Sequence, residues 1–403
     1  MLHSGGGAAQ GGRYSLLALH PRETVTGSEF SALAPKLSTD KLPFGNSWIG
    51  YLGYELLHET ESLAPQQYSY ITLPDLWFAR FGTILRFDHE REIVECFRDG
   101  DSPPLSWPPG PSSPSSLPQV AALTSPMSRD DYLALVAKTR DAITRGDFYQ
   151  ANITRKFTGR FTSAPDPAVL FVRLNAASPG VYSACIRRED ACILSSSPEL
   201  FLRADAQGHM ESRPIKGTAP RMADPQADAT ARTQLELSEK DRAENLMIVD
   251  LMRNDLARSS VPGSVKVERL FEVSSYATLH HMASTVTGQK RAHVSTLDAV
   301  KYCFPPGSMT GAPKYRAMQW CLAHEGIRRG IYSGALGWFG GDGSCDLSVV
   351  IRTLVVDGDR FEFQVGGGIV ADSEPELEWQ ETLTKARGIC KALGVDVKDL
   401  EKL

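Results

Sequence analysis

Three short apolar runs follow one another closely near the middle of the chain, and each has the length of a β-strand. They lie at residues 181–187, 191–196 and 199–204. Later, residues 345–356 and 360–365 flank Asp357-Gly358-Asp359, a turn sequence that predicts a β-hairpin. Strands in such hairpin-like runs, with helices between them, favour an α+β fold. We therefore expect a two-layer antiparallel β-sandwich flanked by helices, in place of a doubly wound parallel sheet.

Helix-start signals occur before, between and after these strands. Ser128 and Asp131, for example, form a capping box before a periodic segment. The expected helices span residues 128–146, 167–175, 238–258, 313–325 and 375–393. In the third of these, Leu246, Val249 and Met252 are expected to form the buried face.

A Pro/Ser-rich segment at residues 101–118 divides the chain into two unequal parts. This composition cannot form a packed element, so it predicts a linker or an exposed loop. Upstream of it, alternating residues at 70–73 and 81–94 predict β-structure. We therefore expect a smaller N-terminal region, followed by a larger region at residues 119–403.

Composition excludes several classes of function. The net charge is -5 and the pI is about 6.0, which gives no footprint for nucleic acid. No apolar run approaches the roughly 20 residues that a membrane span requires, and residues 1–7 carry no export signal. The seven cysteines are scattered, odd in number and without a CxxC pair. This pattern predicts reduced thiols in a cytoplasm, without a disulfide framework or zinc site.

Lys216 lies in the hexapeptide Arg213-Pro214-Ile215-Lys216-Gly217-Thr218. Pro214 fixes φ, and Gly217 allows a tight turn or a close approach to a bound molecule. A lysine held in this way can be desolvated, lose its proton and act as a nucleophile. Taken alone, however, a single lysine is usually a surface residue.

Two expected helices each carry an acidic pair three residues apart. Asp241 and Glu244 form the first pair, and Glu378 and Glu381 form the second. This spacing places both carboxylates of a pair on one helix face. Two such faces together would offer Mg²⁺ the oxygen ligands that it prefers. The alternative is that these side chains are simply solvated.

Two glycine-containing loops are candidate anion sites. Gly366-Gly367-Gly368 could form a nest of backbone amides, or simply a tight exit from a strand. Residues 308–314 lead into a helix N-terminus, which is either an anion site or an ordinary helix start. Neither has the spacing of a phosphate-binding P-loop.

Two further positions could belong to a catalytic site. Glu199 precedes Lys216 on an expected neighbouring strand, so the two are either an acid and a nucleophile or a surface ion pair. His280 and His281 are adjacent on an extended segment, so at most one of them faces a site.

Taken together and in order, these motifs resemble those of the chorismate-utilising enzymes, and most closely the aminodeoxychorismate synthase component I branch. The resemblance covers about 280 residues, from residue 120 to the C-terminus. The segments that carry it are 146–152, 197–199, 213–218, 244–255, 305–314, 351–352, 366–372 and 381–386.

The resemblance implies a fold and roles for individual residues. The fold is a two-layer sandwich of the anthranilate synthase component I type, with the site between its sheets, so that residues 119–403 form the chorismate-binding catalytic region. The implied Mg²⁺ site consists of Glu244 and Glu381, with Asp241 and Glu378 as nearby partners. The implied substrate contacts are Tyr332, Arg352, Lys385, Thr218, Gln150 and the Gly366–Gly368 backbone. His281 matches the histidine that lies near the substrate ring.

Lys216 separates the branches of the family. Anthranilate synthases usually have alanine at this position. In the aminodeoxychorismate enzymes, the lysine attacks C2 of chorismate while the residue matching Glu199 protonates the departing C4 hydroxyl. Isochorismate and salicylate synthases place a water-activating lysine at the position of Gln150, so hydroxylation at C2 is disfavoured here.

The resemblance therefore implies Mg²⁺-dependent amination of chorismate at C4, which gives the precursor of p-aminobenzoate and folate. No cysteine of the chain lies in a Gly-x-Cys-x-Gly elbow, so a glutamine amidotransferase subunit is expected to supply the ammonia. The N-terminal region is expected to be shorter than in the family by a strand or two. The alternatives are anthranilate synthase component I and a non-catalytic binder of chorismate-like acids.

Overall fold

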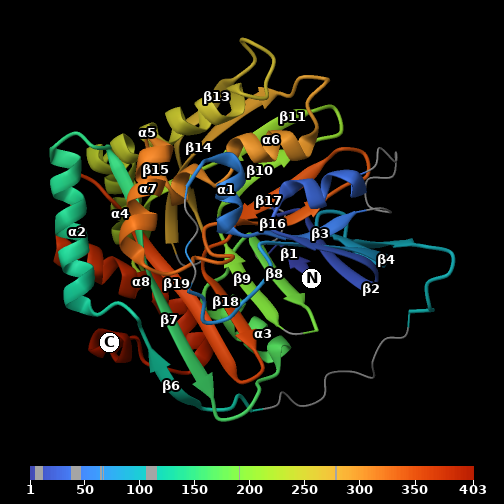
Figure 1. Cartoon of the computed structure of the whole chain (residues 1–403), viewed down its shortest axis with the longest axis horizontal. Helices are drawn as coiled ribbons and strands as arrows, with labels where there is room; N and C mark the ends of the chain where they lie inside the picture. The colour runs from blue at the N-terminus through green and yellow to red at the C-terminus, as the bar shows by residue number, and fades with distance from the viewer. Residues whose placement is uncertain are drawn as a thin grey trace.

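The computed structural model describes residues 1–4, 12–37, 47–63, 66, 68–105, 116–189, 191–276 and 279–403. Within these residues, hydrogen bonds join nineteen strands into one continuous sheet, and each pairing between two of the strands is antiparallel. The sheet folds into two layers, and helices cover the outer faces (Figure 1). The expected two-layer antiparallel sandwich is therefore confirmed.

The first layer is built on the long strand β7, whose residues 151–160 pair with the whole length of β19. The strands follow one another in the order β6 (Val120–Thr124), β7 (Gln150–Phe161), β19 (Arg360–Ile369), β18 (Thr353–Asp357), β9 (Cys192–Ser197) and β8 (Tyr182–Arg187). Three helices pack against it, namely α2 (Arg129–Thr144), α3 (Pro167–Ala177) and α8 (Pro375–Leu393). Their apolar faces and the strands enclose a core around Phe157 and Trp379.

The second layer is centred on β14, which pairs with β13 on one edge and with β11 and β12 on the other. The strand order is β3 (Trp48–Leu52), β16 (Ala335–Phe339), β17 (Cys345–Val349), β10 (Leu200–Ala204), β11 (His209–Arg213), β14 (Leu279–Gln289) and β13 (Lys266–Ser275). Strand β12 (Ile215–Pro220) continues the line of β11. Helices α4 (Pro225–Leu237), α5 (Glu239–Ala257) and α6 (Thr296–Cys303) lie on this side of the molecule.

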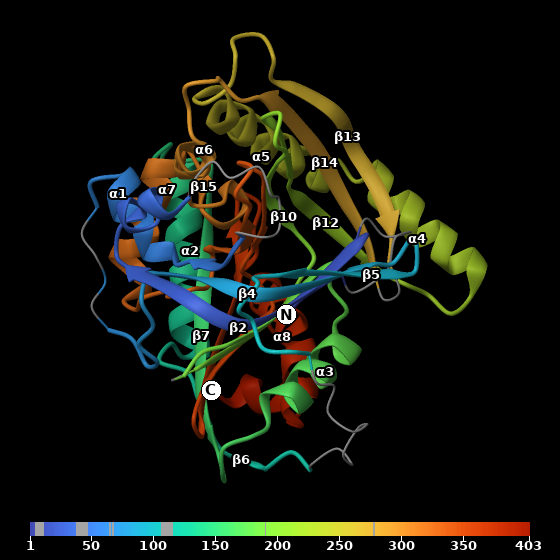
Figure 2. The same cartoon turned by 90° about the vertical axis from the view of Figure 1, so that its right-hand side faces the viewer.

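The N-terminal strands connect the two layers. They are β1 (Leu2–His3), β2 (Tyr14–Gly27), β4 (Leu76–Asp88) and β5 (Ile93–Arg98). Strand β1 pairs with both β8 and β2, and β4 pairs with both β2 and β3. Figure 2 shows β2 and β4 crossing the middle of the molecule between α3 and β13. The division of the chain at residue 118 stays a prediction. Within the Pro/Ser-rich segment, residues 106–115 lie outside the described residues.

The remaining elements are short connections and helix α7. They comprise α1 (Leu57–Thr60), β15 (Gly311–Ala312), α7 (Lys314–Glu325), and the 3-10 turns η2 (Phe30–Ala32), η3 (Ala34–Lys36), η4 (Tyr54–Leu56), η5 (Gly307–Met309) and η6 (Val397–Lys402). Strand β15 pairs with the start of β7, which brings the segment between α6 and α7 next to the first layer.

The helix-start signals are confirmed. Ser128 and Asp131 form the predicted capping box of α2, and Ser238 caps α5 by accepting from the Asp241 amide. The predicted buried face of α5 is partly wrong, because Leu246 is 52% exposed. The buried stripe is centred on Val249 and Met252 and includes Ile248 and Asn245. Steps of three residues drift around a helix with 3.6 residues per turn, so Leu246 leaves this face.

The predicted hairpin is also partly wrong. Strands β18 and β19 form it as expected, with Asp357 paired to Arg360. The segment at 345–356 is not one strand, however, since β17 and β18 are separate and belong to different layers. The chain crosses between the layers at residues 350–352, and Arg352 has a left-handed φ of 51° there. The apolar pattern continues through the crossing because both strands are buried.

Candidate active site

Lys216 extends from one layer of the sandwich toward the other. It lies on β12, and a Cβ added to Gly368 on β19 would stand 3.2 Å from its Nζ. The residue is half-buried, so Lys216 is not the fully exposed surface residue that a single lysine usually is. Gly217 has a φ of +93° and packs against Asp241, so glycine is required beside the lysine.

Glu199 is a buried acid on which the charge of Lys216 acts. It lies between β9 and β10 and is 5% exposed, and the next residue, Leu200, pairs with Arg213 at the start of the lysine motif. Burial raises the pKa of Glu199 to about 7, although the Ser308 hydroxyl and the charge of Lys216 oppose the rise. A carboxyl group with this pKa is protonated in a useful fraction near neutral pH, as a general acid requires. Because Glu199 is buried, the predicted alternative of a surface ion pair with Lys216 is wrong. Their roles as acid and nucleophile stay a prediction.

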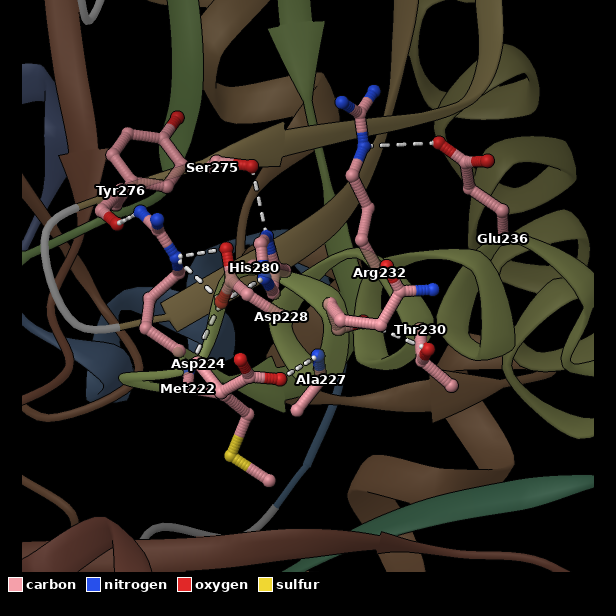
Figure 3. Close-up of polar contacts among 12 residues, drawn as sticks. Met222, Asp224, Ala227, Asp228, Thr230, Arg232, Glu236, Ser275, Tyr276 and His280 are labelled. Atoms are coloured by element: carbon pink, nitrogen blue, oxygen red, sulfur yellow. Dashed lines mark hydrogen bonds and ion pairs between the residues drawn. The ribbon is translucent and has the colours of Figure 1, made fainter.

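The two adjacent histidines have different surroundings. Both ring nitrogens of His280 are engaged, Nε2 by Asp228 at 3.1 Å and Nδ1 by Ser275 at 2.8 Å (Figure 3). His281 contacts Thr218 through Nδ1 at 3.0 Å, and burial lowers its pKa to about 3. Within the described residues, Nε2 of His281 has no hydrogen-bond partner, so His281 is the one that keeps a free ring nitrogen.

Two of the predicted substrate contacts lie next to strands of different layers: Arg352 directly precedes β18, and Tyr332 lies shortly before β16. Burial lowers the pKa of Arg352, and the carboxyl of Glu199 opposes this effect. The Arg352 guanidinium also lowers the pKa of His281, so these three groups share one region. Tyr332 is 6% exposed, and burial raises its pKa above its usual value.

The acidic pairs of α5 and α8 act on one another through their charges. Burial raises the pKa of Glu244 on α5, and the charges of Asp241 and Glu381 add to that rise. Burial and the charge of Glu381 raise the pKa of Glu378 on α8. The ion pair with Lys385 instead lowers the pKa of Glu381. These carboxyl groups therefore influence one another, as an isolated solvated face would not.

The space beside these carboxylates suits a divalent cation. A Cβ on Gly367 would lie 2.9 Å from Glu378 Oε2 and 4.0 Å from Glu381 Oε1, so glycine leaves the space open. Mg²⁺ prefers oxygen ligands, and neighbouring carboxylates that repel one another can provide them. Among the described residues, no three Asp, Glu, His or Cys side chains already converge to metal-binding distance. In the structure, lysine ammonium groups partly balance this negative charge.

The Gly366–Gly368 segment is an extended part of β19 in place of the nest that the sequence suggested. Its residues pair with Thr154, Ile153 and Asn152 of β7 and lack left-handed φ values. What the glycines provide is room. Side chains would collide with Ile153 at 366, with Glu378 at 367 and with Gln150 at 368.

Gln150, Thr218 and Lys385 complete the predicted contacts. Gln150 begins β7, is 1% exposed, and has a buried Oε1 without a hydrogen-bond partner in the described structure. Thr218 is exposed and binds His281. Lys385 donates to the Gly366 carbonyl at 2.8 Å and pairs with Glu381.

Sequence reasoning missed Ser308, Lys240 and the role of Lys314. Ser308 lies on the loop that was considered as an anion site, and its hydroxyl contacts Glu199. Lys240 lowers the pKa values of Glu244, Glu378 and Glu381 through its charge. Lys314 donates to Asp255 at 2.6 Å and to two carbonyls, so this helix start binds part of its own chain. The resemblance of the 305–314 loop gave the only signal for Ser308 and Lys314, and Lys240 gave none.

Comparison with known proteins supports one family. A profile of the chorismate binding enzyme family matches residues 9–391. The chain is 40% identical to "Aminodeoxychorismate synthase component 1" of Klebsiella aerogenes over 355 residues, which cover 87% of this chain and 78% of the relative. It is 34% identical to "Anthranilate synthase component 1 1" of Haloarcula marismortui, over 91% of this chain and 81% of the relative.

The fold agrees with this assignment. The crystal structure of anthranilate synthase component I from Streptococcus pneumoniae TIGR4 superposes with a TM-score of 0.83 and 28% identity, covering 94% of this chain and 92% of that chain. The predicted resemblance to the aminodeoxychorismate synthase component I branch is confirmed by relatives of that name at 39% to 40% identity. This chain belongs to the chorismate binding enzyme family.

Proposed function

We propose that the protein aminates chorismate at C4 with ammonia, with Mg²⁺ as cofactor, to give 4-amino-4-deoxychorismate for p-aminobenzoate and folate synthesis. Relatives named aminodeoxychorismate synthase component 1 support the reaction class. The proposal is supported by two observations: the charge of Lys216 acts on the buried acid Glu199, whose pKa is about 7, and the Lys216 Nζ lies against Gly368. A chorismate binder without catalysis has no use for this pair.

The first proposed step joins Lys216 to the substrate. The neutral amine of Lys216 forms a bond to C2, and the two ring double bonds shift so that the bond from C4 to its hydroxyl breaks. Glu199 gives its proton to that hydroxyl, which leaves as water. A pKa of about 7 allows Glu199 to hold this proton near neutral pH.

The second proposed step releases the lysine. Ammonia forms a bond to C4, the double bonds shift back, and the bond between C2 and the Lys216 nitrogen breaks. The Glu199 carboxylate takes one proton from the new ammonium group and returns to its starting form. Covalent catalysis in this way divides one difficult displacement into two allylic ones.

Charged groups of the site suit a dicarboxylate substrate. Arg352 offers a planar fork of donors, and Lys385 and Tyr332 add further donors. Glu244 and Glu381, with Asp241 and Glu378 nearby, would hold Mg²⁺. When bound, the ion would neutralise a substrate carboxylate and fix its position.

Ammonia is proposed to come from a separate glutamine amidotransferase subunit. The "component 1" names of the relatives support a second component. We further infer a cytoplasmic setting, in keeping with the seven free cysteine thiols. In the described residues, no helix has the length and apolar character needed to cross a membrane.

Product identification tests the proposal. Purified protein, chorismate, Mg²⁺ and ammonium are incubated, and the product is compared with standards of 4-amino-4-deoxychorismate, anthranilate and isochorismate. We expect the 4-amino product. Anthranilate would favour the second candidate, to which the Haloarcula relative and the Streptococcus structure point. Tight chorismate binding without turnover would favour the binder.

A further inference from the structure

Helix α4 directly follows the strand that carries Lys216. Strand β12 ends at Pro220 and α4 begins at Pro225. Asp228, in the first turns of α4, accepts hydrogen bonds from the Met222 amide at 2.8 Å and from the Arg221 guanidinium at 2.9 Å and 3.0 Å (Figure 3). These contacts fold the connection back onto the helix. The Arg221 hydrogen bonds hold the pKa of Asp228 below its usual range, so it remains a carboxylate.

The same carboxylate reaches strand β14. Asp228 Oδ1 lies 3.1 Å from Nε2 of His280, which is 1% exposed and whose other nitrogen contacts Ser275. Arg221, the partner of Asp228, also donates to the Tyr276 carbonyl at 2.7 Å. Directly or through Arg221, the Asp228 side chain therefore connects the end of β12 with His280 on β14 and with Tyr276, which follows β13.

The far end of this network lies against the candidate active site. The Tyr276 ring packs edge-on against the His281 ring, with a centroid distance of 5.5 Å. His281 in turn binds Thr218, two residues after Lys216, and the strand register pairs the two residues. The orientation of the His281 ring is thus bounded by Thr218 on β12 and by Tyr276.

We propose that Asp228 is a positioning residue, which acts through Arg221 and His280 to hold Tyr276 against His281 and so fixes the direction of the free His281 nitrogen. This inference rests on the proposed function, because it assumes that His281 serves the chorismate site. None of the sequence motifs contains Asp228, and it does not touch Lys216, Glu199 or the acidic cluster in the described structure. Small displacements of an aligned group cost up to about 10²-fold in rate.

The test combines Asp228→Asn with His281→Ala in a double-mutant cycle. We expect Asp228→Asn to lower kcat by about 10-fold to 100-fold. KM for chorismate should change by less than about 3-fold, since the residues proposed to bind the substrate carboxylates lie on other elements. In the His281→Ala background, the same substitution should have almost no further effect. Equal losses in both backgrounds, or full activity of Asp228→Asn, would overturn the proposal.

Asp224→Ala is the matched control for loss of helix stability. Asp224 caps the same helix by accepting from the Ala227 amide at 2.8 Å, but it does not contact His280 or Arg221. We expect Asp224→Ala to keep the wild-type kcat even when its melting temperature falls as much as that of Asp228→Asn. If it lost as much kcat as Asp228→Asn does, general loosening of α4 would explain both.

A spectroscopic measurement separates this proposal from the proposed function. The ¹⁵N NMR signals of the His281 ring can be assigned by their loss in His281→Ala. They report the hydrogen bond between His281 and Thr218 and do not depend on which reaction the enzyme catalyses. We expect them to shift in Asp228→Asn and to stay in place in Asp224→Ala. Unchanged signals would overturn the positioning role, whereas failure of the wild-type protein to aminate chorismate would overturn only the proposed function.

Discussion

Lys385 Nζ lies 2.6 Å from a carboxylate oxygen of Glu381, one turn earlier on α8. Each residue was predicted to serve a different partner, Lys385 the substrate and Glu381 the metal ion. The same ammonium also donates to the Gly366 carbonyl, so both of its contacts lie within the protein. Under the proposed function, a bound metal ion would therefore compete with Lys385 for Glu381.

Lys385→Met is expected to change the two affinities in opposite directions. Mn²⁺ serves here as the measurable substitute for Mg²⁺. Removing the Lys385 ammonium beside the proposed ion site should tighten Mn²⁺ binding about fivefold, because about 1 kcal/mol of charge repulsion is lost at a separation of about 4 Å in water. KM for chorismate should rise about tenfold or more with the loss of a charge-assisted contact. Mn²⁺ binding is followed by electron paramagnetic resonance without substrate. The control is Lys240→Met, which removes a nearby positive charge that makes no direct contact with Glu381. Weaker Mn²⁺ binding by Lys385→Met would contradict the competition for Glu381.

Ser308→Ala should shift the pH dependence of the reaction upward. Glu199 must be protonated to act as the acid, so activity is present below its pKa of about 7 and is lost as pH rises through it. The Ser308 hydroxyl stabilises the carboxylate form, so its removal raises the pKa further. A hydrogen bond of about 1 kcal/mol corresponds to about 0.7 pH unit. An alkaline limb of kcat/KM that stayed in place or moved to lower pH would remove Glu199 from the role of acid.

Gly368→Ala should lower turnover strongly while the fold persists. The new Cβ would stand 2.1 Å from Gln150 Nε2 and 3.2 Å from Lys216 Nζ, so it would displace both side chains. We expect kcat to fall about 10²-fold or more. The control is Gly100→Ala, where a Cβ meets nothing within 4 Å. Wild-type turnover by Gly368→Ala would show that Lys216 does not act in this space.

Lys314→Met should destabilise the protein. Asp255 is 3% exposed, and Lys314 donates to it at 2.6 Å and to the Cys303 and Pro305 carbonyls at 2.9 Å each. Removing the lysine leaves a buried carboxylate without its cation, which costs about 3–5 kcal/mol. Urea denaturation measures the change in the free energy of unfolding. The exposed pair at Arg253 and Asp250 provides the comparison, and Arg253→Met should cost less than about 1 kcal/mol.

Local structure could be predicted from the sequence where the signal is local. The capping residue Ser128, the cap at Ser238 and the helix at Pro375–Leu393 all stand where residue type and spacing placed them. The break between β17 and β18 could not be found in this way. Both strands are buried and apolar, so nothing in the pattern marks the crossing at Arg352.

Long-range placement could not be predicted from residue patterns. The carboxylates of α5 and α8 come from helices more than a hundred residues apart, and only the family resemblance placed them opposite each other. The contact between Ser308 and Glu199 depends on how the 305–314 loop packs, which in turn depends on Lys314. Asp228 gave no signal at all, because one carboxylate on an exposed helix is typical of a solvated surface.

The rate of 4-amino-4-deoxychorismate formation by Lys216→Ala tests the central claim most directly. The wild-type protein and the variant are assayed with chorismate, Mg²⁺ and ammonium, and both are first checked for equal melting temperature. If Lys216 forms the bond to C2, the variant should lose at least about 10³-fold in rate, since an activated nucleophile cannot be replaced by solvent. Formation of the 4-amino product by Lys216→Ala at the wild-type rate would contradict the account.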